Sequence, residues 1–227
     1  MLKRTRLELF LATLLLTVSI AGAQATKPAK PHDPKIWEKE IVAFEKQDSE
    51  HMPEPGGVVF TGSSSIRKWK LETSFPTIHP INRGIGGSFT NDCIYYADRA
   101  ITKYHPRLVV ILVGENDLWS GKKVDLVEQD FVDLVGKIQS ADKSTKVILL
   151  SQKPSPKRFR IWPELQEMNA WEKNFADDHD NVKYVDVSAE MLGPDGQPRA
   201  ELYQDGLHPS EKGYAMWNRI LGPYLEK

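Results

Sequence analysis

The chain has 227 residues, enough for one domain with a substantial core and short for two. Charged residues make up 27% and hydrophobic residues 40%, as in ordinary globular proteins. The formal net charge is −1, so no large positive field exists to attract nucleic acid or an anionic membrane. We therefore expect no nucleic-acid partner.

The first residues differ in character from the rest. Lys3, Arg4 and Arg6 precede an apolar run over residues 9–20, which ends in the small-residue stretch 21–25. This order is typical of a secretory signal, and the run is shorter than the roughly 20 residues that span a bilayer. We expect residues 1–25 to be a cleaved signal peptide, 26–34 a flexible lead-in and 35–227 one domain. The protein would then be exported, periplasmic or secreted, with no stable membrane span after cleavage. An uncleaved N-terminal anchor is the alternative.

Apolar and helical patterns alternate along the domain. Five short apolar runs predict strands near residues 58–60, 77–81, 108–113, 147–150 and 182–187. Helical patterns occur near residues 36–48, 89–103, 123–140, 164–179 and 210–225. This alternation predicts an α/β fold with a parallel sheet and helices on both faces. In such sheets the chemistry lies at the carboxyl ends of the strands, so the loops after the strands matter most.

The first of these loops is serine-rich. Gly62-Ser63-Ser64-Ser65 follows the first strand and leads into a helical turn. A serine at the beginning of a helix lies where free backbone N–H groups can stabilise an oxyanion. A simple serine N-cap uses the same residue type, and three serines in a row leave the nucleophile open.

Two further loops carry glycines and an amide. Residues 82–88 hold three glycines in four positions and can aim an N–H at an oxyanion or form a tight turn. Gly114-Glu115-Asn116-Asp117 follows the third strand. The Asn116 amide can donate a hydrogen bond to an oxyanion, or the segment can be an Asx turn or helix cap.

The last candidate segment lies before the final helix. Asp205 precedes His208 by three residues. A histidine beside a carboxylate is the usual general base for a serine nucleophile, although a surface turn capped by Ser210 has the same residues. The one cysteine, Cys93, cannot form an internal disulfide and is expected in the core.

Taken together and in this order, the four segments resemble the SGNH (GDSL-like) hydrolase superfamily over about residues 36–225. The further stretches Arg67-Lys68-Trp69, residues 153–156 and Gly213-Tyr214 resemble its platelet-activating-factor acetylhydrolase-like esterases. The resemblance implies a flavodoxin-like three-layer α/β/α sandwich with a five-stranded parallel sheet. It departs at Ser63, where the name-giving motif has aspartate.

Carried over by position, the resemblance assigns the catalytic triad to Ser64, Asp205 and His208. It assigns the oxyanion hole to the N–H groups of Ser64 and Gly87 and the amide of Asn116. No metal and no cofactor are implied. Trp119 and Trp162 are candidates for lining the substrate pocket, or for packing alone.

The expected function is hydrolysis of small carboxylic esters, with short, acetyl-like acyl groups favoured. A carbohydrate O-acetyl esterase and a lysophospholipase-like lipid esterase are the alternatives among enzymes, and an inactive glycan-binding module is the alternative outside them. The oligomeric state is left open.

Overall fold

The computed structural model describes residues 32–226. The signal peptide predicted for residues 1–25, and most of the lead-in, lie outside them. Within this part of the chain no helix is long and apolar enough to cross a membrane.

The described chain forms one five-stranded sheet in which every pairing is parallel. The strands are β1 (Val58–Gly62), β2 (Ile81–Gly84), β3 (Leu108–Leu112), β4 (Lys146–Leu150) and β5 (Val182–Val185). Their order in the sheet is β2-β1-β3-β4-β5. The chain adds β2 on one side of β1 and then crosses to the other side of β1, where β3, β4 and β5 follow in turn. This order is flavodoxin-like, with the switch point between β1 and β3.

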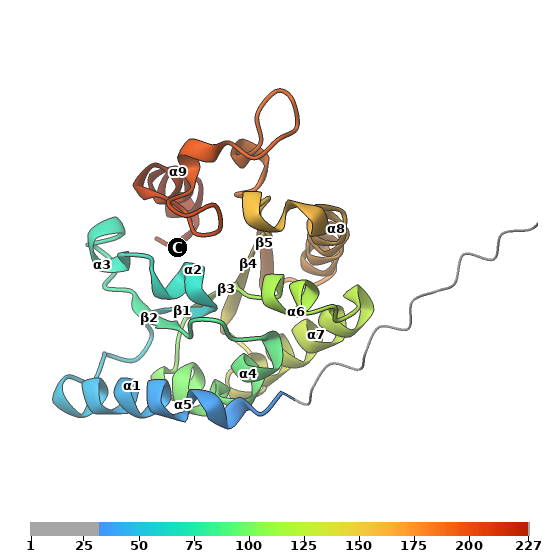
Figure 1. The fold of residues 1–227 in the computed structure, drawn as a ribbon. Helices are drawn as coiled ribbons and strands as arrows, with labels where there is room; N and C mark the ends of the chain where they lie inside the picture. The colour runs from blue at the N-terminus through green and yellow to red at the C-terminus, as the bar shows by residue number, and fades with distance from the viewer. Residues whose placement is uncertain (1–31, 227) are drawn as a thin grey trace, which may run out of the picture.

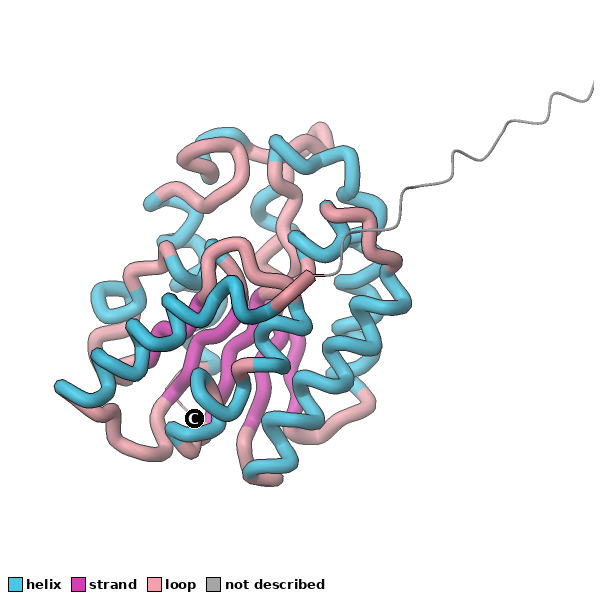
Figure 2. Tube along the Cα trace, turned by 60° about the horizontal axis from the view of Figure 1, so that its bottom comes forward, coloured by secondary structure: helices cyan, strands magenta, loops and turns pink. Residues whose placement is uncertain are grey.

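Helices cover both faces of the sheet (Figures 1 and 2). One layer contains α1 (Glu38–Glu50), α4 (Thr90–Tyr95), α5 (Ala97–Ala100), α7 (Val124–Ala141) and α8 (Trp162–Asp177). The other contains α2 (Ser64–Arg67), α3 (Leu71–Ser74) and α9 (Glu211–Leu221). The short α6 (Glu115–Trp119) follows β3. The predicted three-layer α/β/α sandwich is confirmed.

The continuous apolar strands are explained by this double cover. Val109 and Ile111 of β3 belong to the core cluster on one face, and Val110 lies in the cluster on the other. A strand buried on both faces cannot alternate apolar with polar residues.

The bounds predicted for the second strand, residues 77–81, were wrong. Residues 77–80 form a loop in which His79 has a φ of 45°, and the strand begins at Ile81. It continues through the polar residues Asn82 and Arg83. The Asn82 amide donates to the Ile66 carbonyl at 2.9 Å, and Arg83 donates to Asp48 at 2.6 Å. These distant partners make a polar strand stable, and no apolar run reveals them.

The helix predicted at 89–103 is also divided. It consists of α4, α5 and a 3-10 turn, Thr102–Tyr104. The first break falls at Tyr96, whose hydroxyl donates to the Pro34 carbonyl at 3.1 Å. The helix predicted from residue 36 begins as a 3-10 turn, Pro34–Trp37, and the Asp33 side chain accepts a hydrogen bond from the Lys35 N–H at 3.0 Å.

Candidate active site

The structure brings three of the predicted residues into one hydrogen-bonded row. His208 Nε2 lies 2.9 Å from Ser64 Oγ, and His208 Nδ1 lies 2.7 Å from Asp205 Oδ2. A carboxylate can only accept, so Nδ1 carries the proton of the neutral imidazole. Nε2 is then the free acceptor that faces the Ser64 hydroxyl, which is the geometry of a nucleophile with its base.

The strand-to-helix loop that holds Ser64 depends on a close backbone approach. Gly62 has a φ of 135°, and a Cβ at this position would lie 2.0 Å from the Leu112 carbonyl oxygen. The next residue, Ser63, donates its N–H to that same oxygen at 3.1 Å. Only glycine permits β1 and β3 to approach so closely where the loop leaves the sheet.

The three consecutive serines have different surroundings. Ser63 is the N-cap residue of α2, but its side chain makes no capping hydrogen bond. Ser65 is buried, with 3% of its surface exposed. Ser64, the first residue of α2, contacts His208. The tertiary structure therefore distinguishes between residues that the sequence could not separate.

The Asp205 carboxylate is held by its own turn. Its Oδ1 accepts the N–H groups of Leu207 and His208 at 3.0 and 2.8 Å. Burial alone would raise the pKa of Asp205, but the hydrogen bonds from His208 and Leu207 outweigh it and hold the pKa well below the ordinary value. Asp205 is therefore a carboxylate at neutral pH and fixes the imidazole orientation.

The glycine loop after β2 lies beside the Asn116 side chain. Gly87 occupies a turn with a φ of 89° and is exposed. Its neighbour Ser88 accepts a hydrogen bond from Asn116 Nδ2 at 2.9 Å, and the Ser88 hydroxyl donates to the Gly62 carbonyl at 3.3 Å. The end of β1 and the loops after β2 and β3 are thus tied to one another, and Asn116 contacts the residue that follows Gly87.

The aspartate of the same motif has a supporting position. Asp117 is fully buried, and its Oδ2 accepts the N–H of Thr90 at 3.0 Å. Burial raises the pKa of Asp117 to about 6, although Lys122 and the Thr90 hydrogen bonds oppose the shift. The side chain joins α6 to the first turn of α4.

Sequence reasoning missed two cations at this site. Lys68 Nζ lies 3.4 Å from His208 Nδ1 and 3.9 Å from Asp205 Oδ2. Arg158 Nη1 donates to Asn116 Oδ1 at 2.8 Å. Arg158 lies in the 3-10 segment Pro156–Ile161 after β4, a loop that ends at the pocket candidate Trp162, but no pattern in the sequence distinguishes this arginine from its basic neighbours.

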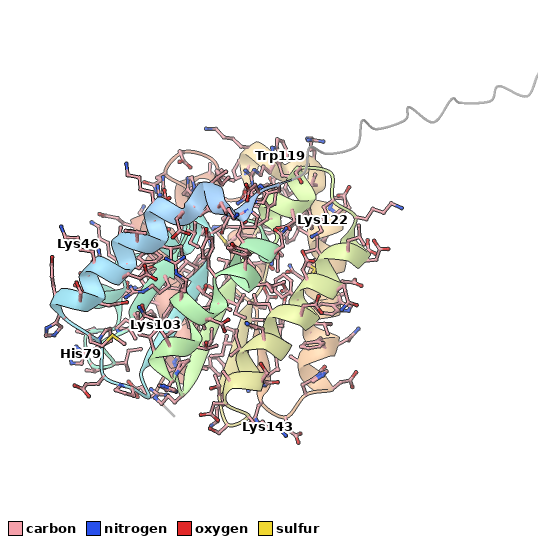
Figure 3. The ribbon with its side chains drawn as sticks, turned by 90° about the horizontal axis from the view of Figure 1, so that it is seen from below. Lys46, His79, Lys103, Trp119, Lys122 and Lys143 are labelled. Carbon is pink, nitrogen blue, oxygen red and sulfur yellow. The ribbon has the colours of Figure 1, made fainter. Side chains whose placement is uncertain are left out.

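The two tryptophan candidates lie in different settings. Trp162 is 8% exposed and packs in the core. Trp119 is half-buried at the end of α6, with the guanidinium groups of Arg158 and Arg160 over its ring. Trp119 and Lys143 lie at opposite ends of the molecule in Figure 3, because one follows β3 and the other precedes β4.

The described residues do not offer a cysteine nucleophile or a cluster of metal ligands. Cys93 is 2% exposed, and burial raises the pKa of its thiol to about 12, which removes it as a nucleophile. Among residues 32–226, no group of three or more His, Cys, Asp or Glu side chains could hold a metal ion.

Solved structures of similar fold come from several bacteria. A protein from Streptococcus pneumonia that is described as a platelet activating factor is 24% identical to this chain, with a TM-score of 0.76. The match covers 84% of this chain and 93% of that one. A GDSL-like lipase from Bacteroides thetaiotaomicron is 22% identical, with a TM-score of 0.68 and coverages of 86% and 97%. An acetylxylan esterase from Geobacillus stearothermophilus is 17% identical, with a TM-score of 0.60 and coverages of 77% and 96%.

At these identities the likeness establishes the fold. No curated protein is significantly similar in sequence. The sequence model of the GDSL-like lipase/acylhydrolase family, however, matches residues 61–216, which include every segment of the site described above. The chain therefore belongs to the GDSL-like lipase/acylhydrolase family, whose members hydrolyse ester bonds.

Proposed function

We propose that the protein is a serine esterase that hydrolyses carboxylic esters with short acyl groups through a covalent acyl-enzyme. The observation that carries the proposal is the row from Ser64 Oγ through His208 to Asp205, with separations of 2.9 and 2.7 Å. We also propose that an N-terminal signal exports the protein to the periplasm or out of the cell.

The first half of the reaction forms the acyl-enzyme. His208 Nε2 takes the hydroxyl proton as Ser64 Oγ bonds to the ester carbonyl carbon, and the carbonyl electron pair moves to its oxygen. The resulting oxyanion accepts hydrogen bonds from the N–H groups of Ser64 and Gly87 and from the Asn116 amide. As this tetrahedral intermediate collapses, His208 gives its proton to the leaving alcohol and the ester C–O bond breaks.

The second half releases the acid. His208 removes a proton from water, which attacks the acyl carbon, and Ser64 leaves with the proton returned by His208. Asp205 stabilises the imidazolium in both halves. Apart from the water that is consumed, these steps use the side chains and backbone donors named here.

The test is hydrolysis of p-nitrophenyl acetate by the protein and by Ser64→Ala and His208→Ala. Both variants should fall to near-background rates, a loss on the order of 10⁶-fold in kcat for a triad residue. Ser63→Ala, at the neighbouring position, should retain the parent rate. Activity that survives in folded Ser64→Ala would disprove the assignment. A parent protein that neither hydrolyses the ester nor reacts with a fluorophosphonate probe would favour the glycan-binding module.

The alcohol and acyl parts of the substrate can then be identified. Rates on acetyl, butyryl and octanoyl esters separate a short-chain esterase from a lipid esterase. Acetylated xylan tests the carbohydrate alternative, which is supported by the fold shared with an acetylxylan esterase.

A further inference from the structure

Arg158 contacts the side chain proposed to bind the oxyanion, although it belongs to a different loop. It lies 42 residues after Asn116 in the chain, and its Nη1 donates to Asn116 Oδ1 at 2.8 Å. Its side chain is 16% exposed, so the contact is largely shielded from water. A charged donor in such a place makes a stronger hydrogen bond than a neutral one.

The two neighbours of Asn116 determine which way its amide points. The Ser88 carbonyl can only accept, and it receives Nδ2 at 2.9 Å. The Arg158 guanidinium can only donate, and it meets Oδ1. Rotation of the amide by 180° would place two acceptors together and two donors together. Only one orientation is therefore stable, and it leaves the second Nδ2 hydrogen available for an oxyanion.

Arg158 is itself fixed by its surroundings. Its Nη1 lies 3.7 Å from Glu115 Oε1, and its guanidinium carbon lies 5.2 Å from the centre of the Trp119 ring. Glu115 is held in turn by Lys153 and by the Ser155 hydroxyl, the latter at 3.0 Å. The long arginine side chain is thus held in place before the substrate arrives. Its conformational entropy is therefore lost on folding and not on substrate binding.

The charge of Arg158 also acts on the amide electronically. A cation on Oδ1 draws electron density from the amide and makes the opposite N–H a better donor, as in other chains of hydrogen bonds. The effect is largest when that N–H faces a developing negative charge.

We propose that Arg158 is a positioning residue for the oxyanion hole, acting through Asn116 to orient its amide and strengthen its free N–H. The proposal rests on the proposed function, because it requires Asn116 to bind the oxyanion. Arg158 would then contribute to the transition state and little to binding of the ground-state ester.

The first measurement compares Arg158→Met with Arg160→Met on p-nitrophenyl acetate. Arg160 belongs to the same loop and its guanidinium carbon lies 4.1 Å from the centre of the same Trp119 ring, but it makes no contact with Asn116 in the described structure. We expect Arg158→Met to lower kcat by about 10- to 100-fold with KM within about twofold, less than outright loss of one donor costs. Arg160→Met should keep kcat within about twofold. A raised KM at unchanged kcat would instead make Arg158 a substrate-binding residue and overturn the proposal.

The second measurement tests the route through Asn116. In an Asn116→Ala background, Arg158→Met should lower kcat by no more than about twofold further, because its partner is already gone. Losses that multiply would mean that Arg158 acts independently, against the proposal. If Arg158→Met does not fold, Arg158→Lys replaces it, because it keeps the charge beside Glu115 but loses the guanidinium fork. A loss of kcat that disappears in the Asn116→Ala background would support the proposal. An equal loss in both backgrounds would contradict it.

The variants distinguish a wrong role for Arg158 from a wrong enzymatic activity. If Ser64→Ala and Asn116→Ala are inactive and Arg158→Met behaves like Arg160→Met, the esterase assignment stands and the role of Arg158 is wrong. If folded Asn116→Ala keeps the parent kcat, the oxyanion assignment itself is wrong.

Discussion

Asn116 lies in the first turn of α6, with one amide hydrogen on the Ser88 carbonyl and its oxygen on Arg158. None of these three residues belongs to a strand of the sheet. The proposed catalytic role of Asn116 can therefore be tested separately from its effect on folding.

Asn116→Ala tests that separation. It should lower kcat by about 100- to 1000-fold, the usual effect of removing one oxyanion donor. The free energy of unfolding should fall by only about 1 to 3 kcal/mol, since Ser88 and Arg158 each lose a partner. Steady-state kinetics and urea denaturation measure the two effects, with Ser120→Ala in the turn that ends α6 as the control. A folded Asn116→Ala variant with unchanged kcat would remove Asn116 from the mechanism.

At the level of elements, β2 shows how a polar strand is held at the edge of the sheet. Arg83 points away from solvent and donates to Asp48 of α1 at 2.6 Å and to the Tyr104 hydroxyl at 2.6 Å. Lys103 also pairs with Asp48. Burial would raise the pKa of Asp48, but Lys103, Tyr104 and Arg83 together lower it, so the carboxylate stays ionised.

Arg83→Met should destabilise the protein by about 3 kcal/mol, because it breaks a buried ion pair and leaves the buried Asp48 carboxylate to the more exposed Lys103. The matched control is Arg99→Met. Arg99 also pairs with acids of α1, Glu38 and Glu45, but its side chain is 37% exposed, so its loss should cost about 0 to 1 kcal/mol. Urea denaturation of both variants gives the comparison. Equal losses would show that burial does not govern the β2–α1 contact.

At the level of the whole molecule, the stability should depend on a carboxyl group in the core. Glu172 of α8 is fully buried, and its Oε1 accepts a hydrogen bond from Gln152 Nε2 at 2.8 Å. Burial raises the pKa of Glu172 from 4.5 to about 8, against the opposing hydrogen bond from Gln152. The folded state therefore keeps a proton that the unfolded chain releases near pH 4.5.

This difference makes stability fall as pH rises. Between about pH 4.5 and 8 the folded state binds more protons than the unfolded state. The stability that protonated Glu172 contributes is therefore fully present below this range and is lost as the pH rises through it. Asp117 acts with the same sign around pH 6, so Glu172 dominates the decline from about pH 7.5 upward. Denaturation at pH 6.5, 7.5 and 8.5 should show a decline that Glu172→Gln flattens. Parallel declines in both proteins would show that Glu172 does not titrate there.

The fold and much of the candidate site could be predicted from sequence because their signals are local. Buried β-branched runs such as Val109-Val110-Ile111 indicate strands without any knowledge of the contacts that the rest of the chain makes. Strand–helix alternation then implies a parallel sheet, and a parallel sheet places its loops at one end. The serine segment 62–65 and Asn116 follow such runs directly, and Asp205 and His208 precede the final helix, so all of these segments are candidates from sequence, while the individual roles follow from the family resemblance.

Tertiary structure decided what depends on contacts between distant residues. It selects Ser64 among three serines by its contact with His208, 144 residues away. It places β2 at polar residues because Asp48 and Ile66 satisfy them. It brings Arg158 to Asn116 and buries Glu172. Hydrogen bonds and charges inside a protein depend on partners that only folding supplies, and no periodicity in the chain encodes them.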